Sequence, residues 1–369
     1  MLKKIFTTVL IMLCASGFVY SQTELQVSSE VKTGLYWEKW EAPGSDGEEF
    51  AKMHNNDDAG PNEGRFRMNM QITNDNVGVK VRFEQTAWTQ GAPNVWAFAF
   101  GYVNFFKEQL KVVAGKLGES PWSAGGPDIW QELDDQVGIR FEVKPQIVPG
   151  LNVGFVLNQW NKERYFKEKE TLVDMLKETV FGISYTHDYF HGRFSYRLDG
   201  ETDVWTVQDG MSMMYRLEER VLKNYVDGLQ LWVNGWWTGI GTEKEDKDKV
   251  NRAYYNWFYA QWAPEQFNLQ LRLGYHKMVK FDDFRTRISF TYNILSWLSV
   301  GAAFNFQITP GDESVKDVPY KLWNIEPQIR ATFAPGTYVA LWYQFENQPI
   351  SKDRDKQTQR LNLRTVFTL

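Results

Sequence analysis

Cysteine is almost absent from this sequence, and long apolar runs are confined to its first residues. Of 369 residues, one is a cysteine, Cys14, and four are histidines. Because Cys14 lies in an N-terminal segment that we expect to be removed, the mature chain has no disulfide and no thiol chemistry. The alternative that Cys14 becomes a lipidated N-terminus is disfavoured by Leu13 before it.

A membrane-spanning helix is excluded after that segment, because no apolar run approaches the roughly eighteen residues that such a helix needs. If the chain resides in a membrane, it must therefore cross it as a barrel. Only a closed sheet pairs every backbone group in the bilayer without helices.

The N-terminal segment has the features of a secretion signal. Lys3 and Lys4 give it a positive start, residues 5–19 form its apolar part, and a small residue precedes the expected cleavage site. We therefore expect residues 1–21 to be a signal peptide and residues 22–369 to be the exported chain.

No set of residues indicates an enzyme, a cofactor or a metal site. We find no nucleophile beside a base and no paired catalytic acids in a defined context. His187 and His191 have the i, i+4 spacing of ligands on a helix, but the local pattern is strand and turn. The oxygen-rich run at residues 55–58 could hold a hard cation, although a solvated acidic loop is the simpler interpretation. We expect no enzymatic activity, no cofactor, no metal and no nucleic-acid partner.

Aromatic residues are abundant instead. The chain contains 16 Trp, 17 Tyr and 25 Phe, or 16% aromatic residues, while its mean hydropathy is only −0.46. This combination of aromatic and polar residues suits a membrane barrel, which needs an apolar outer band with aromatic girdles and a polar interior.

The clearest repeating unit is a hairpin at residues 65–84. Apolar and polar residues alternate from Arg65 to Ile72, a polar turn follows at residues 73–76, and the alternation resumes from Val77 to Glu84. A period of two gives a strand one oily and one charged face. A run of roughly ten residues, tilted by about 40°, also rises by about 25 Å, the height of an outer-membrane apolar band.

The same unit recurs throughout the mature chain and predicts about eighteen antiparallel strands in a single all-β transmembrane barrel domain, residues 22–369. Short turns alternate with long loops, and the loop at residues 41–63 is the first of these. Sixteen strands are the alternative, because the alternation is weakest between residues 211 and 262, where a bulge at residues 253–262 would explain the change of phase. The strands are expected at residues 25–37, 65–72, 77–84, 95–106, 110–117, 137–143, 151–157, 181–185, 193–198, 211–217, 229–237, 253–262, 267–275, 288–292, 298–306, 325–333, 339–345 and 358–369.

Taking the apolar parity of each strand as outward gives a basic lumen, although the net charge of the whole chain is −5. By this rule the aromatic run of Trp96, Phe98, Phe100 and Tyr102 would face lipid. The acidic residues expected inside are Glu30, Glu84, Glu142, Glu218 and Glu326. The basic residues expected inside are Lys32, Arg65, Arg67, Lys80, Arg82, Arg140, Arg193, Arg197, Arg216, Arg272, Arg285, Arg287, Arg330, Arg360 and Arg364.

Within this set we predict a basic pore wall. If the last strand closes on the first, strands one to three and the last strand become neighbours, and Arg140 follows on the sixth. A narrow channel lined by positive charge concentrates anions. The alternative is that these side chains only form ladders that stabilise the wall. The residues of the predicted wall are Lys32, Arg65, Arg67, Lys80, Arg82, Arg140, Arg360 and Arg364.

The third long loop, residues 118–134, is expected to fold into the barrel and form its constriction. Glycines allow sharp backbone turns there, and two prolines stiffen the path between them. Its acidic residues would face the basic wall; the alternative is an acidic flap that points outward. The candidate constriction residues are Glu119, Trp122, Asp128, Trp130, Glu132 and Asp134.

Two short segments carry a resemblance to a known family. Gly101-Tyr102-Val103-Asn104 and Ala114-Gly115-Lys116-Leu117, followed by a glycine-rich loop, resemble the corresponding hairpin of general-diffusion and phosphate-type outer-membrane porins. The last strand resembles the assembly signal of such proteins, with Leu361, Leu363, Phe367 and Leu369 in one phase, although it ends in leucine. The resemblance implies an outer-membrane location in a diderm bacterium, contact with outer-membrane lipid and with the barrel-assembly machinery, and a homotrimer.

Three functions remain open. The first is a porin for passive diffusion of small hydrophilic solutes with a preference for anions. The second is a substrate-specific porin for sugars or phosphate-like anions, in which loop aromatics such as Trp88, Trp122, Trp130 and Trp160 would stack on sugar rings. The third is a non-channel surface barrel such as an adhesin.

Overall fold

The computed structural model describes residues 23–53, 65–85, 95–118, 120–124, 137–159, 176, 179–198, 211–240, 253–277, 282–309, 320–351 and 354–369. The predicted signal peptide, residues 1–21, lies outside these ranges and stays a prediction. Within them, no helix is both long and apolar enough to cross a membrane.

The described chain forms one sheet of nineteen strands. Among the described residues, a short 3-10 helix, η1 (Leu222–Asn224), lies between two of the strands. The strands are β1 (Glu24–Glu41), β2 (Glu48–Met53), β3 (Arg65–Asn74), β4 (Val77–Gln85), β5 (Val95–Phe105), β6 (Leu110–Lys116), β7 (Val137–Val143), β8 (Leu151–Gln159), β9 (Val180–Thr186), β10 (Phe190–Arg197), β11 (Met211–Glu219), β12 (Leu229–Ile240), β13 (Ala253–Trp262), β14 (Phe267–Lys277), β15 (Asp282–Leu295), β16 (Leu298–Thr309), β17 (Tyr320–Ala334), β18 (Thr337–Ser351) and β19 (Arg354–Thr368).

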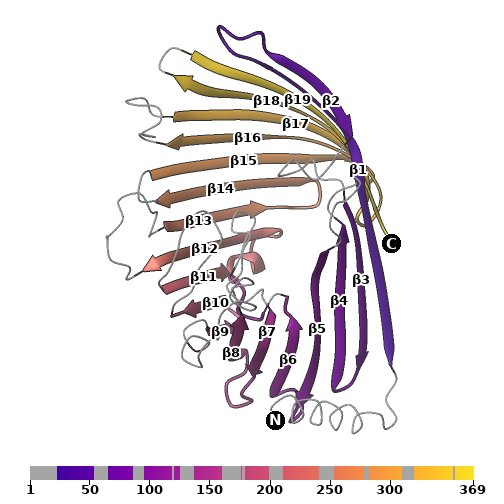
Figure 1. Cartoon of the computed structure of the whole chain (residues 1–369), viewed down its shortest axis with the longest axis vertical. Coiled ribbons are helices and arrows are strands. Elements are labelled where there is room, and N and C mark those ends of the chain that lie inside the picture. Colours follow the sequence, from indigo (N-terminus) through magenta and orange to yellow (C-terminus); the bar gives the residue numbers. More distant parts are fainter. Residues whose placement is uncertain are drawn as a thin grey trace, which may run out of the picture.

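Strands β2 and β3 together occupy one strand position of the barrel. Both pair antiparallel with the same edge of β1: the register runs from Trp40 opposite Glu48 to Leu35 opposite Met53, and then from Lys32 opposite Arg65 onward. The two strands therefore follow one another along β1. Figure 1 shows β1 running beside β2 at one end and beside β3 at the other. The nineteen strands thus make an eighteen-stranded barrel, which confirms the predicted number and excludes sixteen.

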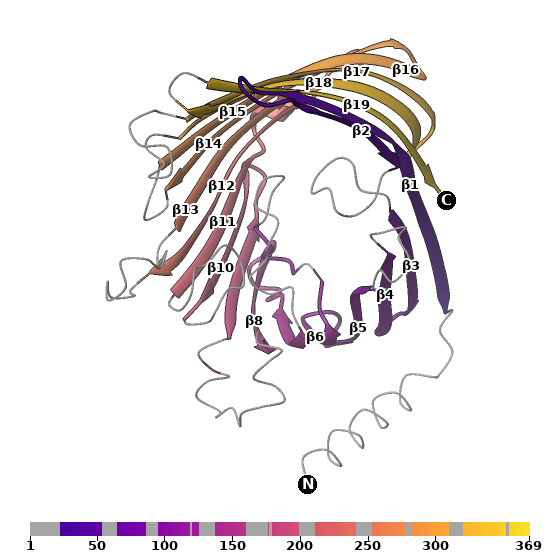
Figure 2. The ribbon, with the colours of Figure 1, turned by 45° about the horizontal axis from the view of Figure 1, so that its top comes forward.

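The barrel closes through antiparallel pairing of β19 with the other edge of β1. The register extends without a break from Glu30 opposite Thr368 to Glu41 opposite Gln357. Beyond it, the backbone N–H groups of Ser29 and Leu369 each donate to the other residue's carbonyl oxygen. Figure 2 shows the resulting ring of strands. Closure removes the sheet edges that would otherwise expose unpaired backbone groups.

Side chains alternate between the two faces as predicted. On β1, for example, Leu25 and Leu35 are 61% and 52% exposed on the outer face, whereas Lys32 and Tyr36 on the other parity are buried. In the membrane this outer face is the apolar band, and the polar parity faces the interior.

Connections at one end of the barrel are short turns, as predicted, at residues 75–76, 106–109, 144–150, 187–189, 220–228, 263–266, 296–297 and 335–336. At the other end, the predictions of long loops at residues 41–63 and 346–357 are wrong. The loop predicted at residues 41–63 begins instead as a tight hairpin into β2, and only residues 352–353 separate β18 from β19. The bulge expected in β13 is also wrong, because β13 pairs continuously with β12 and β14.

Three of the aromatics of β5 that were expected to face lipid, Phe98, Phe100 and Tyr102, point the other way; the side chain of Trp96, the fourth, lies outside the described part of the chain. Phe98 pairs opposite Arg82, and Tyr102 opposite Val113, which is fully buried on the lumen side. Phe100 and Tyr102 pack against the buried cluster that Val113 joins. The prediction failed because the outer parity of this strand holds small residues such as Ala99 and Gly101, so the larger aromatic face is the inner one.

Candidate functional site

The beginning of the third loop lies inside the barrel. Leu117, Trp122 and Ala124 are fully buried within a cluster on the lumen side of the wall. An infolded third loop is thereby confirmed for residue 118 and residues 120–124, the part of the loop that the structure describes.

Two glycines form the socket for Trp122. A Cβ atom at Gly182 of β9 would lie 2.1 Å from Cγ of the Trp122 indole, and one at Gly154 of β8 would lie 2.7 Å from its Cη2 atom. Real Cβ atoms do not approach other atoms so closely, so only glycine lets the indole lie against the wall at these two positions.

Filling the space beside Trp122 with a side chain at Gly182 should destabilise the barrel. We expect Gly182→Ala to lower the free energy of unfolding by about 1–3 kcal/mol, because the added methyl overpacks a filled site. Denaturant unfolding of protein refolded into lipid vesicles would measure the loss. Gly192→Ala is the control, since a Cβ there meets its nearest neighbour, the Phe190 ring, at an ordinary 3.7 Å.

A double variant tests the assignment to Trp122. Gly182→Ala combined with Trp122→Ala should cost less than the sum of the two single changes, because the second change removes the ring that the first one meets. Strict additivity would show that the methyl and the indole do not collide.

Polar contacts fasten the same loop to the wall. Arg140 Nη1 donates to the Gly118 carbonyl oxygen at 2.8 Å, and Arg193 Nη1 donates to the Ser123 carbonyl oxygen at 3.2 Å. The loop is locally closed as well, since the Ser123 N–H donates to the Ser120 carbonyl oxygen at 3.1 Å. Each guanidinium bond to a carbonyl adds a charge-assisted hydrogen bond of about 1.5–3 kcal/mol.

Part of the lumen is therefore packed like a protein core. The cluster joins the third loop to inward residues of strands β6, β8, β9 and β11–β13. Its members are Val113, Leu117, Trp122, Ala124, Val156, Val180, Met214, Trp236, Trp257 and Tyr259. Sequence reasoning missed it because it treated every inward face as polar; the signal was an apolar character of both faces in β12 and β13.

Of the predicted constriction residues, the structure places only Trp122. Glu119, Asp128, Trp130, Glu132 and Asp134 lie outside the described residues. Their expected approach to the basic wall stays a prediction.

The structure brings the first part of the predicted basic wall together. Lys32 and Arg65 face each other across β1 and β3, and Arg65 Nε lies 2.7 Å from Glu30 Oε1. Arg67 Nε lies 2.8 Å from Glu84 Oε2. Acidic partners thus interleave with the bases, which relieves the repulsion between like charges on neighbouring strands.

Two further members of the wall lie on β4. Arg82 donates through Nε to Asn69 Oδ1 at 2.7 Å, and its guanidinium lies 4.8 Å from the centroid of the Phe98 ring. Lys80 lies opposite Gln71 on one side and Phe100 on the other.

Closure places the bases of β19 beside β1. Arg360 Nε lies 2.6 Å from Glu38 Oε2, and its Nη1 lies 3.4 Å from Glu346 Oε2. The Tyr36 hydroxyl also donates to Glu38. Arg364 lies opposite Gly34 in the β1 register.

Arg140 is the eighth member, and it is buried rather than open to the channel. Its side chain and that of Glu142 are each 3% exposed, with Nε and Oε1 2.8 Å apart. This ion pair and the bond to Gly118 direct the guanidinium to protein atoms.

Among the inward acids missed from the sequence, three form ion pairs with predicted lumen bases. Glu38, Glu346 and Asp283 lie just beyond the strand ends that the alternation predicted, because the strands are longer than expected. Glu38 and Glu346 flank Arg360, and Asp283 Oδ2 lies 2.6 Å from Arg285 Nε. The interior is thus a network of paired charges as well as a basic surface.

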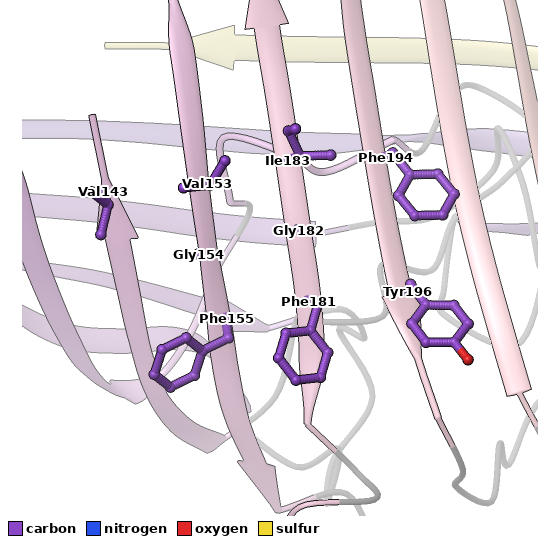
Figure 3. A pocket seen from close by; sticks show the side chains of 9 residues that line it. All are labelled: Val143, Val153, Gly154, Phe155, Phe181, Gly182, Ile183, Phe194 and Tyr196. Atoms are coloured by element: carbon purple, nitrogen blue, oxygen red, sulfur yellow. The ribbon is translucent and has the colours of Figure 1, made fainter. Parts of the chain in front are cut away.

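The outer surface carries an apolar depression of about 470 Å³ behind the Trp122 socket. Figure 3 shows Gly154 and Gly182 between two rows of side chains, with Val153 and Ile183 on one side and Phe155 and Phe181 on the other. At Gly154 and Gly182 the floor is main chain alone, because both residues occupy inward-facing positions, which place no side chain on the outer face.

No group of three or more His, Cys, Asp or Glu side chains suited to a metal ion occurs within the described ranges.

Comparisons with known proteins place the fold. No family model and no curated protein sequence matches the chain. Among solved structures, it is similar to OpdQ of Pseudomonas aeruginosa, with a TM-score of 0.54, 11% identity and coverage of 94% of this chain and 98% of the other. It is also similar to OmpF of Salmonella typhi, with a TM-score of 0.51, 10% identity and coverage of 94% and 100%.

A third similar structure is an anion-selective porin from Comamonas acidovorans, with a TM-score of 0.50, 8% identity and coverage of 94% of this chain and 100% of that one. At such low identities the likeness concerns the fold. The chain is an eighteen-stranded antiparallel barrel with the fold of the outer-membrane porins, as the resemblance in its sequence implied.

Proposed function

We propose that this protein is an outer-membrane porin that allows small hydrophilic solutes to diffuse passively, with a preference for anions. The observation that carries the proposal is the closed barrel with an apolar outer face and a charged inner face. A sheet of this kind satisfies its backbone in lipid and encloses a polar path.

The excess of bases on the lumen parity supports anion preference. The acidic residues there are Glu24, Glu30, Glu38, Glu48, Glu84, Glu142, Glu218, Asp283, Glu326 and Glu346. The more numerous basic residues are Lys32, Arg65, Arg67, Lys80, Arg82, Lys111, Arg140, Arg193, Arg197, Arg216, Arg272, Arg285, Arg287, Arg330, Lys356, Arg360 and Arg364. The summed positive potential raises the local concentration of anions.

The proposal includes export by the signal peptide at residues 1–21, insertion by the barrel-assembly machinery, contact with outer-membrane lipid and assembly as a homotrimer. It includes no enzymatic step. The C-terminal strand supports the assembly step, because Phe367 is 52% exposed on the outer face, where an assembly factor can reach it.

Sugar specificity finds no support among the described residues. Trp122, one of the aromatics expected to stack on sugars, is fully buried against the barrel wall. Trp88, Trp130 and Trp160 lie outside the described residues.

The mature protein should fractionate with the outer membrane and migrate on gels in a heat-modifiable manner. The reason is that a closed barrel stays folded in detergent until boiling breaks the β1–β19 seam along with the other strand pairs. Fractionation as a soluble protein, or equal mobility before and after boiling, would refute the membrane barrel. Planar-bilayer recording of the same preparation then tests for a channel and measures its ion preference.

A further inference from the structure

The apolar depression on the outer face lies between two rows of side chains that run across strands β7–β10 (Figure 3). The row nearer the short turns consists of Val143, Val153, Ile183 and Phe194, which the sheet register places opposite one another. The second row is aromatic and consists of Phe141, Phe155, Phe181 and Tyr196.

Neither row of side chains covers the main chain between them. Three members of the first row are β-branched, and such side chains are short and stiff. In the aromatic row the rings contact one another along the row, with centroids 4.8 Å apart for Phe141 and Phe155 and 6.5 Å apart for Phe155 and Phe181. The Tyr196 hydroxyl donates to Met211 Sδ at 2.8 Å, so this ring leans toward β11. The space between the rows therefore stays open.

This open space calls for an apolar occupant. Val143, Phe181, Ile183 and Phe194 are 38–45% exposed along its two sides. In the apolar band of the membrane, an unfilled space would deprive these side chains of dispersion contacts. A flexible lipid tail can follow a narrow depression between two rows, whereas a second barrel presents a convex wall that would touch only the rims.

The depression leads from the short-turn end of the barrel toward the middle of the bilayer. Strands of such barrels tilt by about 40°, so a row across them is inclined by about the same angle to the membrane plane. Short turns lie on the periplasmic side. On β9, Tyr185 follows Ile183 on the outward parity, and its ring centroid lies 5.9 Å from that of His187 in the β9–β10 turn.

The β9–β10 turn offers hydrogen-bond donors at the level of the lipid headgroups. The Tyr189 backbone N–H donates to His187 Nδ1 at 3.3 Å, so the proton of the neutral imidazole is on Nε2. The Tyr189 ring lies 4.9 Å from that of His187 and is 64% exposed. Rings with an apolar body and a polar tip suit the membrane–water interface. The phosphate and ester oxygens of a phospholipid are acceptors for such donors.

We propose that the depression binds one acyl chain of a phospholipid of the periplasmic leaflet, whose headgroup lies at the β9–β10 turn. The inference deepens the proposed function and rests on it, because it requires the barrel to lie in the outer membrane. It distinguishes this lipid from those along the rest of the outer face, since its chain is held between two fixed rows of side chains.

Photolabelling with a phospholipid that carries a diazirine in one acyl chain tests the site. The mature protein is reconstituted into phosphatidylcholine vesicles that contain this probe, irradiated and digested, and the labelled peptides are measured by mass spectrometry. Labelling of β8 and β9 should exceed that of β15 and β16 about fivefold, which corresponds to about 1 kcal/mol in favour of the depression.

Ile183→Trp and Ile288→Trp are matched variants for this experiment. Ile183 lines the depression and is 42% exposed, while Ile288 on β15 is 45% exposed on the outer face. An indole at position 183 fills the space that the acyl chain would occupy. Ile183→Trp should therefore lower the labelling of β8 and β9 at least about threefold, and Ile288→Trp should leave it within about twofold.

Even labelling around a conducting barrel would overturn the site, and so would equal effects of the two substitutions. A second copy over the depression is tested with Ile183→Cys, because the mature chain is expected to contain no other cysteine. Disulfide-linked dimers of this variant would assign the depression to a subunit contact and overturn the lipid site. A protein that forms no channel would instead refute the proposed function, while enriched labelling of β8 and β9 in a heat-modifiable, non-conducting barrel would still support the site.

Discussion

Deletion of residues 120–130 is expected to raise the single-channel conductance severalfold and to speed the uptake of bulky solutes. The described start of this loop occupies the lumen, with Trp122 in the socket at Gly154 and Gly182. Removing it leaves that cross-section to water, and ion flow through a channel is limited by its narrowest part. Planar-bilayer recording of the deletion variant beside the intact protein measures the change.

The single substitution Trp122→Ala distinguishes the effect of fixing the third loop to the wall from the effect of the volume that the loop occupies. It keeps the loop but removes its largest buried contact, which costs about 3–5 kcal/mol in a well-packed site. We expect a noisier channel with an intermediate mean conductance. An unchanged conductance after the deletion, in a barrel that is still heat-modifiable, would mean that the constriction lies elsewhere.

Reversing three charges of the basic wall should move the channel's preference toward cations. The variant carries Arg65→Glu, Arg67→Glu and Arg82→Glu, which changes the lumen charge by six. The ion preference of a narrow pore follows the sign of its fixed charges. The reversal potential in a salt gradient should shift toward that of a cation-selective channel, and less so at high ionic strength, where the charges are screened.

A charge-swapped pair provides the control for this variant. Arg65 pairs with Glu30 at 2.7 Å, so Arg65→Glu combined with Glu30→Arg keeps both the ion pair and the net charge. The swap should leave the reversal potential near that of the intact protein. If the triple variant behaves like the swap, these arginines stabilise the wall and do not select ions.

The barrel could be predicted from the sequence because alternation on two unlike faces is a local signal. The hairpin of β3 and β4 shows it, with charged residues facing in and apolar ones facing out over the whole length. A strand position that is shared by two separate strands, as by β2 and β3, has no such local signal. Residues 48–53 are too few to establish a period, and their pairing with β1 depends on a register set by the rest of the sheet.

The candidate site was less accessible to sequence reasoning, since it depends on which residues meet across the lumen. The parity rule counted Arg216 and Arg272 among the lumen bases, but it could not reveal the stack of Trp232 on Tyr259 between them. It also counted Arg140 as a pore charge. That guanidinium binds Glu142 and the third loop, contacts between distant segments that no local pattern encodes.

The glycine pair beneath Trp122 makes the wall one main-chain layer thick. Inside lies the indole that holds the third loop, and outside lies the apolar depression that would be filled by lipid tails. Bilayer thickness and acyl-chain order would thus act directly on the main chain at Gly154 and Gly182, against which Trp122 packs. We therefore expect the conductance of the channel to depend on the lipid composition of the membrane around it.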